Sequence, residues 1–160
     1  MISELEKILF EMIAEHRALL AEAQLHAAAV RKLDLAVMEH SAARQDAARA
    51  RIAMLENRRK LQTQIDARTL RLPPNATLAQ LAHADPARRP RLLALRDELR
   101  KVAFAIAQQT HVTARVTGAV LGHLNTTVRL LSSTVQHAGT YTKQGTPRVA
   151  TRIGVMEAVA

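Results

Sequence analysis

Residues 90–145 read PRLLALRDELRKVAFAIAQQTHVTARVTGAVLGHLNTTVRLLSSTVQHAGTYTKQG. The opening proline suits the first turn of a helix, because the N–H that it lacks would go unpaired there anyway. No second proline occurs in the stretch, and its first apolar residues recur at steps of three and four positions. These residues are Leu92, Leu95, Leu99, Val102 and Ile106. The spacing places them on one face, so the sequence predicts a long amphipathic helix over residues 90–138.

The second half of this helix differs from the first in charge and in register. Between Thr110 and Thr134 the only Lys, Arg, Asp or Glu residues are Arg115 and Arg129. Val116 and Val120 continue the early series, and the later apolar residues lie one position out of register with it. The apolar face of this half is formed by Val116, Val120, Leu121, Leu124, Val128, Leu131 and Val135. Because a solvated helix face is normally charged, this face is a candidate contact surface for a partner. Packing onto the first long helix of the chain is the alternative interpretation.

Three small residues, Ala114, Gly118 and Gly122, recur every four positions between the two apolar series. Small side chains at this spacing let a second helix approach closely. Each glycine also costs a helix about 1 kcal/mol relative to alanine. The pattern therefore predicts either a close helix crossing or a local weak point, and the sequence leaves both open.

A second long helix is predicted for residues 2–72. No glycine or proline occurs before Pro73, and Ser3 with Glu6 forms a capping-box pair at the start. Apolar residues and two histidines follow a heptad pattern: Leu5, Leu9, Met12, His16, Leu19, Ala23, His26, Val30, Leu33 and Val37. Beyond Val37 the pattern slips in phase, which we interpret as a stutter within a continuous helix.

A connector over residues 73–89 separates the two long helices. It contains Pro73 and Pro74, a short segment TLAQLAH over residues 77–83 that suits about two helical turns, and Pro86. Long helices joined by a short connection pack antiparallel. The sequence thus predicts an all-α fold of two long antiparallel helices, an extended coiled-coil hairpin with a short helical connector. The helical domain spans residues 1–139, followed by an irregular, flexible C-terminal tail over 140–160.

The composition excludes several classes of function. The chain has no cysteine, and its seven histidines include no pair spaced by three or four residues, so we expect no metal site. No glycine-rich phosphate loop or nucleophile motif is present, so we expect neither a cofactor nor enzymatic activity. No apolar run is long enough to insert into a membrane. The four glutamates in residues 1–17 are unlike a signal peptide, so we expect a cytoplasmic protein.

The chain carries a net charge of +9, concentrated beyond residue 41. The densest basic runs are Arg88–Arg91 and Arg58–Lys60. No aromatic residue lies among them to stack on a base, so nucleic acid is not the expected partner. A basic, solvated surface is the simpler interpretation, and nonspecific phosphate binding is kept as an alternative.

Several segments in order resemble the FlgN-type flagellar export chaperones. They are a long N-terminal helix rich in Leu, Ala and Glu, the segment TLAQLAH, and the charged helix start RLLALRDELRKV. The later segments are the amphipathic LGHLNTTVRLLSSTV and the exit TYTKQG, with Tyr141 and Gly145. The resemblance covers residues 2 to about 147. The basic middle of the chain departs from the family pattern.

This resemblance implies a cytoplasmic chaperone that binds the C-terminal helices of hook-associated (hook–filament junction) proteins. It would keep them from premature assembly and deliver them to the flagellar export gate. Client binding would fall on the face from Val116 to Val135, and Tyr141 would dock to the gate or cap the helix end. Two alternatives stay open: a structural coiled-coil adaptor that self-associates through Leu5–Val37, and a nucleic-acid-associated protein. A homodimer is compatible with the sequence.

Overall fold

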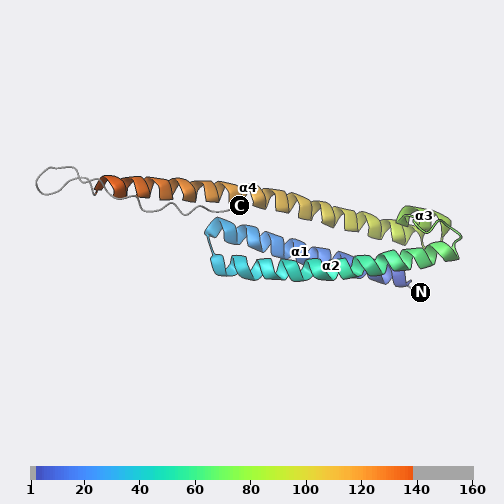
Figure 1. Ribbon diagram of the computed structural model, residues 1–160. Helices are drawn as coiled ribbons and strands as arrows, with labels where there is room; N and C mark the ends of the chain where they lie inside the picture. The colour runs from blue at the N-terminus through green and yellow to red at the C-terminus, as the bar shows by residue number, and fades with distance from the viewer. Residues whose placement is uncertain (1–2, 139–160) are drawn as a thin grey trace, which may run out of the picture. The chain divides into compact units, whose positions relative to one another are not determined.

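The computed structural model describes the backbone of residues 3–138 and the side chains of residues 3–133. These residues form four helices and no strand: α1 (Glu4–Lys32), α2 (Leu35–Thr69), α3 (Leu78–Ala84) and α4 (Arg89–Ala138), as Figure 1 shows. The all-α class and the short helical connector between long helices are therefore confirmed. The tail over 140–160 lies outside the described residues.

The structure corrects the expectation of one continuous helix over 2–72, because the chain reverses at Leu33 and Asp34. Leu33 adopts the left-handed conformation, with φ 56° and ψ 34°. Its N–H donates to the Val30 carbonyl at 3.2 Å, and the Asp34 N–H donates to the Ala29 carbonyl at 3.0 Å. This pair of bonds is a Schellman motif. Asp34 then caps α2 by accepting a hydrogen bond from the Val37 N–H at 3.2 Å. The phase slip predicted near Val37 is thus a reversal of the chain.

The end of α2 has the same geometry. Arg71 also has φ 56°, its N–H donates to Arg68 at 3.1 Å, and the Leu72 N–H donates to Ala67 at 2.8 Å. The helix therefore ends at Thr69, before the two prolines that were expected to terminate it. The capping box of Ser3 and Glu6 is confirmed, and Thr77 and Gln80 form a second one at the start of α3.

Helices α1 and α2 form an antiparallel hairpin. Arg58 of α2 pairs with Glu4 and Glu11, Arg51 pairs with Glu15 at 2.9 Å, and Arg44 pairs with Glu22 at 2.7 Å. Ion pairs of exposed side chains contribute little to stability. These ion pairs do show how the two helices are aligned. As the residue number increases along α1, the residue number of its partner in α2 decreases, so the helices are antiparallel.

The main core lies where α1, the end of α2, α3 and the start of α4 meet. It is formed by Leu5, Leu9, Ile13, Ala67, Ala76, Leu81, Ala82, Leu92 and Leu95. The heptad positions of α1 are buried at Leu5, Leu9, Met12, Leu19, Ala23 and Val30. These side chains already have partners within the chain, so the self-association proposed through Leu5–Val37 loses most of its interface.

The first half of α4 runs parallel to α1 and antiparallel to α2. Arg17 of α1 forms an ion pair with Glu98, and Arg88, just before α4, pairs with Asp66 near the end of α2 at 2.9 Å. Leu99 packs against Ile8, Met12 and Leu55. The expected antiparallel pair of long helices is thus α2 with α4, and α1 lies beside both. Contacts divide the chain into two units, residues 1–117 and residues from 118 onward.

Candidate functional site

The apolar face of α4 changes its environment along the helix. Between Leu99 and Val120, the side chains that recur at steps of three and four positions are half-buried. From residue 121 to residue 133 every side chain is exposed. The exposed fractions of the predicted contact residues are 60% for Leu121, 47% for Leu124, 58% for Val128 and 61% for Leu131. The structure thus has four large apolar side chains on one uncovered face of a helix.

The remaining predicted site residues differ from these four. Val116 and Val120 are half-buried, so they offer less surface to a partner. Val135 belongs to α4, but its side chain lies outside the described residues. Tyr141 lies outside them altogether, so its proposed docking or capping role stays a prediction.

Several hydroxyl groups in residues 121–133 form hydrogen bonds within α4 itself. The hydroxyls of Thr126 and Thr127 donate to the carbonyls of Gly122 and His123 at 2.9 and 3.0 Å. The Ser133 hydroxyl donates to the Leu130 carbonyl at 2.7 Å. Because each of these hydroxyls bonds to its own helix, a threonine here displays mainly its methyl group to a partner. The segment is therefore a more apolar surface than the sequence alone indicates.

The two glycines of α4 have open space where a side chain would be. A Cβ added at Gly118 or Gly122 would meet nothing within 4 Å. No helix among the described residues crosses closely at this point. The described residues thus show no close crossing at the glycines, and the local weak point stays a prediction.

Some exposed apolar residues were not anticipated. Phe104 is 66% exposed on α4, and Val112 and Leu130 are also exposed. Leu130 lies on the side of the helix opposite Leu124 and Val128, outside the predicted apolar face. Phe10 of α1 directly follows Leu9 and lies off the heptad positions, and it is 54% exposed. No periodic signal marks these residues; only an inventory of large apolar side chains would have found them.

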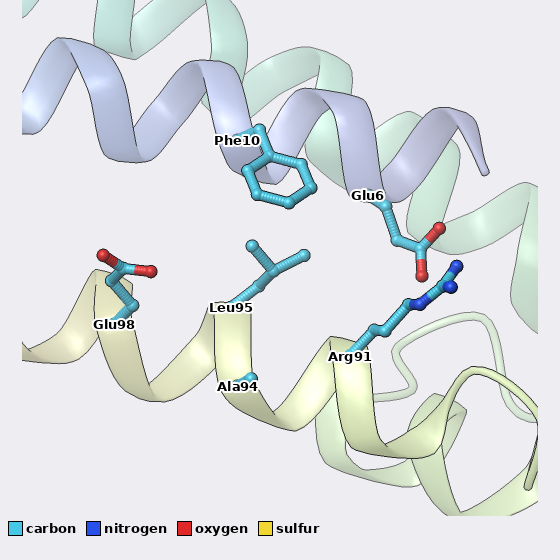
Figure 2. A pocket seen from close by; sticks show the side chains of 6 residues that line it. All are labelled: Glu6, Phe10, Arg91, Ala94, Leu95 and Glu98. Carbon is cyan, nitrogen blue, oxygen red and sulfur yellow. The ribbon is translucent and has the colours of Figure 1, made fainter. Parts of the chain in front are cut away.

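Phe10 lines a groove of about 340 Å³ between α1 and the start of α4. Figure 2 shows its ring facing Leu95, with Glu6 and Arg91 pointing toward one another at one end and Glu98 at the other. Glu6 is almost fully buried. One of its carboxylate oxygens accepts the Ser3 N–H at 2.7 Å, and the other finds no partner among the described residues.

The chain matches the FlgN protein family over residues 1–148. That match covers nearly all of the sequence. The chain belongs to the FlgN family. No curated protein and no solved structure matches it. FlgN proteins are flagellar export chaperones rather than enzymes.

Several cations of this FlgN protein are engaged in ion pairs within the chain. Arg58 pairs with two glutamates of α1, Arg59 pairs with Glu56, and Arg88 pairs with Asp66 and Asp85. Both basic runs that suggested nucleic acid are therefore partly neutralised by carboxylates. The hydrogen bond from Arg59 also lowers the pKa of Glu56.

Neither a metal site nor a membrane span is found in the described part of this FlgN chain. No three His, Asp or Glu side chains among residues 3–133 gather to hold a metal ion. None of the described helices combines the length and hydropathy required to cross a bilayer.

Proposed function

We propose that this FlgN-family chain is a cytoplasmic export chaperone for hook-associated proteins. It binds their C-terminal helices, prevents premature assembly and delivers them to the flagellar export gate. The observation that carries the proposal is the exposed face of Leu121, Leu124, Val128 and Leu131, which no other described side chain covers. An amphipathic helix binds by laying its apolar face on such a surface.

The chemistry of this face suits a client helix that would otherwise self-associate. Burying one leucine or valine contributes about 1.5–3 kcal/mol, so a few of them account for a stable complex. The near absence of charge on the segment means that recognition depends on apolar packing. A bound chaperone would then cover the apolar side chains through which the client assembles.

The proposal is tested with two matched variants of the full chain. Leu124→Asp places a carboxylate in the middle of the face, and Thr126→Asp places the same charge on the opposite side of the same helical turn. We expect Leu124→Asp to weaken binding of a hook-associated C-terminal helix at least about tenfold in calorimetry, because one buried leucine is replaced by a charge. Thr126→Asp should bind like the wild type.

Circular dichroism of both variants controls for loss of the helix. Equal binding by the Leu124→Asp and wild-type chains, at unchanged helicity, would place the client elsewhere. The groove beside Phe10 would then be the next surface to examine.

The second part of the proposal concerns the C-terminal tail, residues 140–160, which follows the helical domain over 1–139. We assign export-gate docking to Tyr141. A Tyr141→Ala chain should keep the client affinity of the wild type and lose binding to the gate. If the side chain only caps the end of α4, the same variant would lower helicity and leave gate binding unchanged.

A further inference from the structure

The groove between α1 and the start of α4 contains a buried hydrogen-bond acceptor that the described part of the chain leaves unsatisfied. Glu6 lines the groove and is only 1% exposed. Its Oε2 accepts the Ser3 N–H at 2.7 Å, and its Oε1 has no hydrogen-bond partner among the described residues. Buried polar atoms are nearly always hydrogen-bonded, and a buried carboxylate oxygen without a donor is unfavourable. A ligand that brings a donor to Oε1 would therefore gain binding energy there.

The other side chains of the groove give it an apolar wall. Phe10 lies one helical turn after Glu6 on α1, and Ala94 and Leu95 line the same groove from α4. Figure 2 shows the Phe10 ring facing Leu95, with Glu6 at one end. Because Phe10 is 54% exposed, much of its surface is open to a second ring. The volume of about 340 Å³ falls within the range of small-ligand clefts.

The charged groups of the groove already balance one another. Glu98, at the other end from Glu6, forms an ion pair with Arg17. Arg91 points toward Glu6 and offsets its charge, but no hydrogen bond from Arg91 reaches Oε1. An additional cation or anion would leave one charge unbalanced, and its desolvation would be costly. A neutral donor therefore fits this groove better than a charged one.

We propose that the groove receives a tyrosine or tryptophan side chain presented by a partner protein other than the client. The aromatic ring lies against Phe10 and Leu95, and its O–H or N–H donates to Glu6 Oε1. Both side chains combine an apolar ring with a neutral donor, which matches the apolar wall and the free acceptor. Phenylalanine supplies the ring without the donor, so the groove should distinguish it from tyrosine. Binding here does not depend on client binding by the later part of α4.

Two probes that differ by one hydroxyl group test the proposal on the full chain. N-acetyl-tyrosinamide carries the donor, and N-acetyl-phenylalaninamide lacks it. We expect both to shift the Leu95 methyl signals in NMR spectra. The affinity for the second probe should be about tenfold weaker, because it lacks the hydrogen bond to the carboxylate. N-acetyl-tryptophanamide should bind as well, and its fluorescence reports binding directly because the chain has no tryptophan.

Glu6→Gln removes the free acceptor and keeps the start of α1. Glutamine also suits a capping box, so its amide oxygen can accept the Ser3 N–H while its NH₂ group faces the groove. The tyrosine and phenylalanine probes should then bind with similar affinity. Glu11→Gln, which changes an exposed glutamate of α1 outside the groove, is the matched control and should keep the tenfold difference. Phe10→Ala should weaken both probes, with circular dichroism as the check on folding.

Several results would overturn the proposal. Equal affinity of the wild-type chain for the two probes, or no shift at millimolar concentration, would exclude recognition of the donor by Glu6. Probe binding that Phe10→Ala leaves unchanged would place the probes outside the groove. Tighter probe binding by Tyr141→Ala would mean that the chain's own tyrosine, rather than a partner, occupies the groove.

Two further measurements separate this groove from the proposed client site. Leu124→Asp should leave probe affinity unchanged, so failure of the client proposal and failure of this one are distinguishable. A saturating hook-associated C-terminal helix should likewise leave the probes bound. Displacement of the probes by that helix would overturn a partner other than the client.

Discussion

Two residues that are not glycine close two helices of this protein in the left-handed conformation. Leu33 and Arg71 both have φ 56°, at the position of the Schellman motif where glycine is most common. Because a Cβ crowds the following carbonyl, this conformation costs an L-residue about 1–2 kcal/mol. The backbone hydrogen bonds that follow each residue, and the packing of the reversed chain, offset that cost.

At the residue scale we expect Leu33→Gly to stabilise the fold. Glycine avoids the cost of about 1–2 kcal/mol that the left-handed conformation imposes on leucine. It also loses more backbone entropy on folding, which costs about 0.5–1 kcal/mol. The free energy of unfolding should therefore rise by about 0.5–1 kcal/mol. Leu33 is 55% exposed, so little packing is lost. Urea unfolding measures the change.

Ala28→Gly is the control for this substitution. Ala28 is exposed within α1, where glycine should lower the free energy of unfolding by about 1 kcal/mol. If Leu33→Gly destabilises the chain as much as Ala28→Gly does, the reversal at Leu33 is wrong and α1 continues through it.

At the scale of the element, α4 is one helix whose two parts differ in charge and in burial. Its first part is charged and supplies Leu92 and Leu95 to the core. Its later part is nearly uncharged, and its side chains from residue 121 to residue 133 are exposed. Gly118 and Gly122 lie where one part gives way to the other, next to the boundary between the two units. Each glycine lowers the local stability of the helix at this point relative to alanine.

We expect Gly118→Ala and Gly122→Ala to strengthen the helix there. Each substitution should add about 1 kcal/mol, because the new Cβ meets no neighbour and removes the entropic cost of glycine. Amide hydrogen exchange over the surrounding turns should slow by roughly fivefold for each. Ala119→Gly, between the two glycines, should have the opposite effect.

The client affinity of these alanine variants shows whether the glycines only weaken the helix or also let a client helix approach it closely. Unchanged affinity would leave them as a weak point only. A loss of affinity, with increased helicity, would show that the client helix approaches the backbone closely at the glycines, which the free chain does not reveal.

At the scale of the whole molecule, Arg88 connects parts of the chain that are distant in sequence. Its guanidinium donates to Asp66 of α2 at 2.9 Å and to Asp85, at the end of α3, at 2.6 Å. Asp85 also accepts the Arg88 backbone N–H at 3.3 Å. These bonds hold the connector against the end of the α1–α2 hairpin, beside the main core.

The hydrogen bond from Arg88 lowers the pKa of Asp85 below its ordinary value. A carboxyl whose pKa is lower in the folded than in the unfolded chain stabilises the fold above its unfolded pKa, about 3.9, and stops doing so as the pH falls through its folded value. We therefore expect Asp85→Asn to lower the urea midpoint at neutral pH and to converge with the wild type below about pH 4.

Asp97→Asn is the control for the loss of one carboxylate. Asp97 is exposed, and its ion pair among the described residues is with its neighbour Arg96. At neutral pH it should show a smaller midpoint change than Asp85→Asn does. Glu56, whose pKa is also lowered, is present in both variants, so some acid sensitivity should persist in each. A constant difference between Asp85→Asn and the wild type at all pH values would contradict a role for this carboxylate.

Much of the molecule follows from the sequence by itself. The spacing of Leu5, Leu9 and Met12, and of Leu92 and Leu95, predicted which faces are buried, because an α-helix returns to the same side every three or four residues. The capping box of Ser3 and Glu6 followed from local hydrogen-bonding chemistry, and the short helix of TLAQLAH followed from the prolines on either side of it. The order of these segments also indicated the FlgN family.

Only the tertiary structure decided where the first helix reverses and which apolar face is left uncovered. A Leu–Asp pair within a helical pattern carries no strong stop signal, since the left-handed Leu33 is stabilised by backbone bonds and by packing of the two helices it joins. Leu99 and Leu131 likewise follow the same kind of apolar spacing, yet one packs against Ile8 and Leu55 and the other is exposed. Periodicity determines which side of a helix is apolar, and burial depends on whether another element lies against that side.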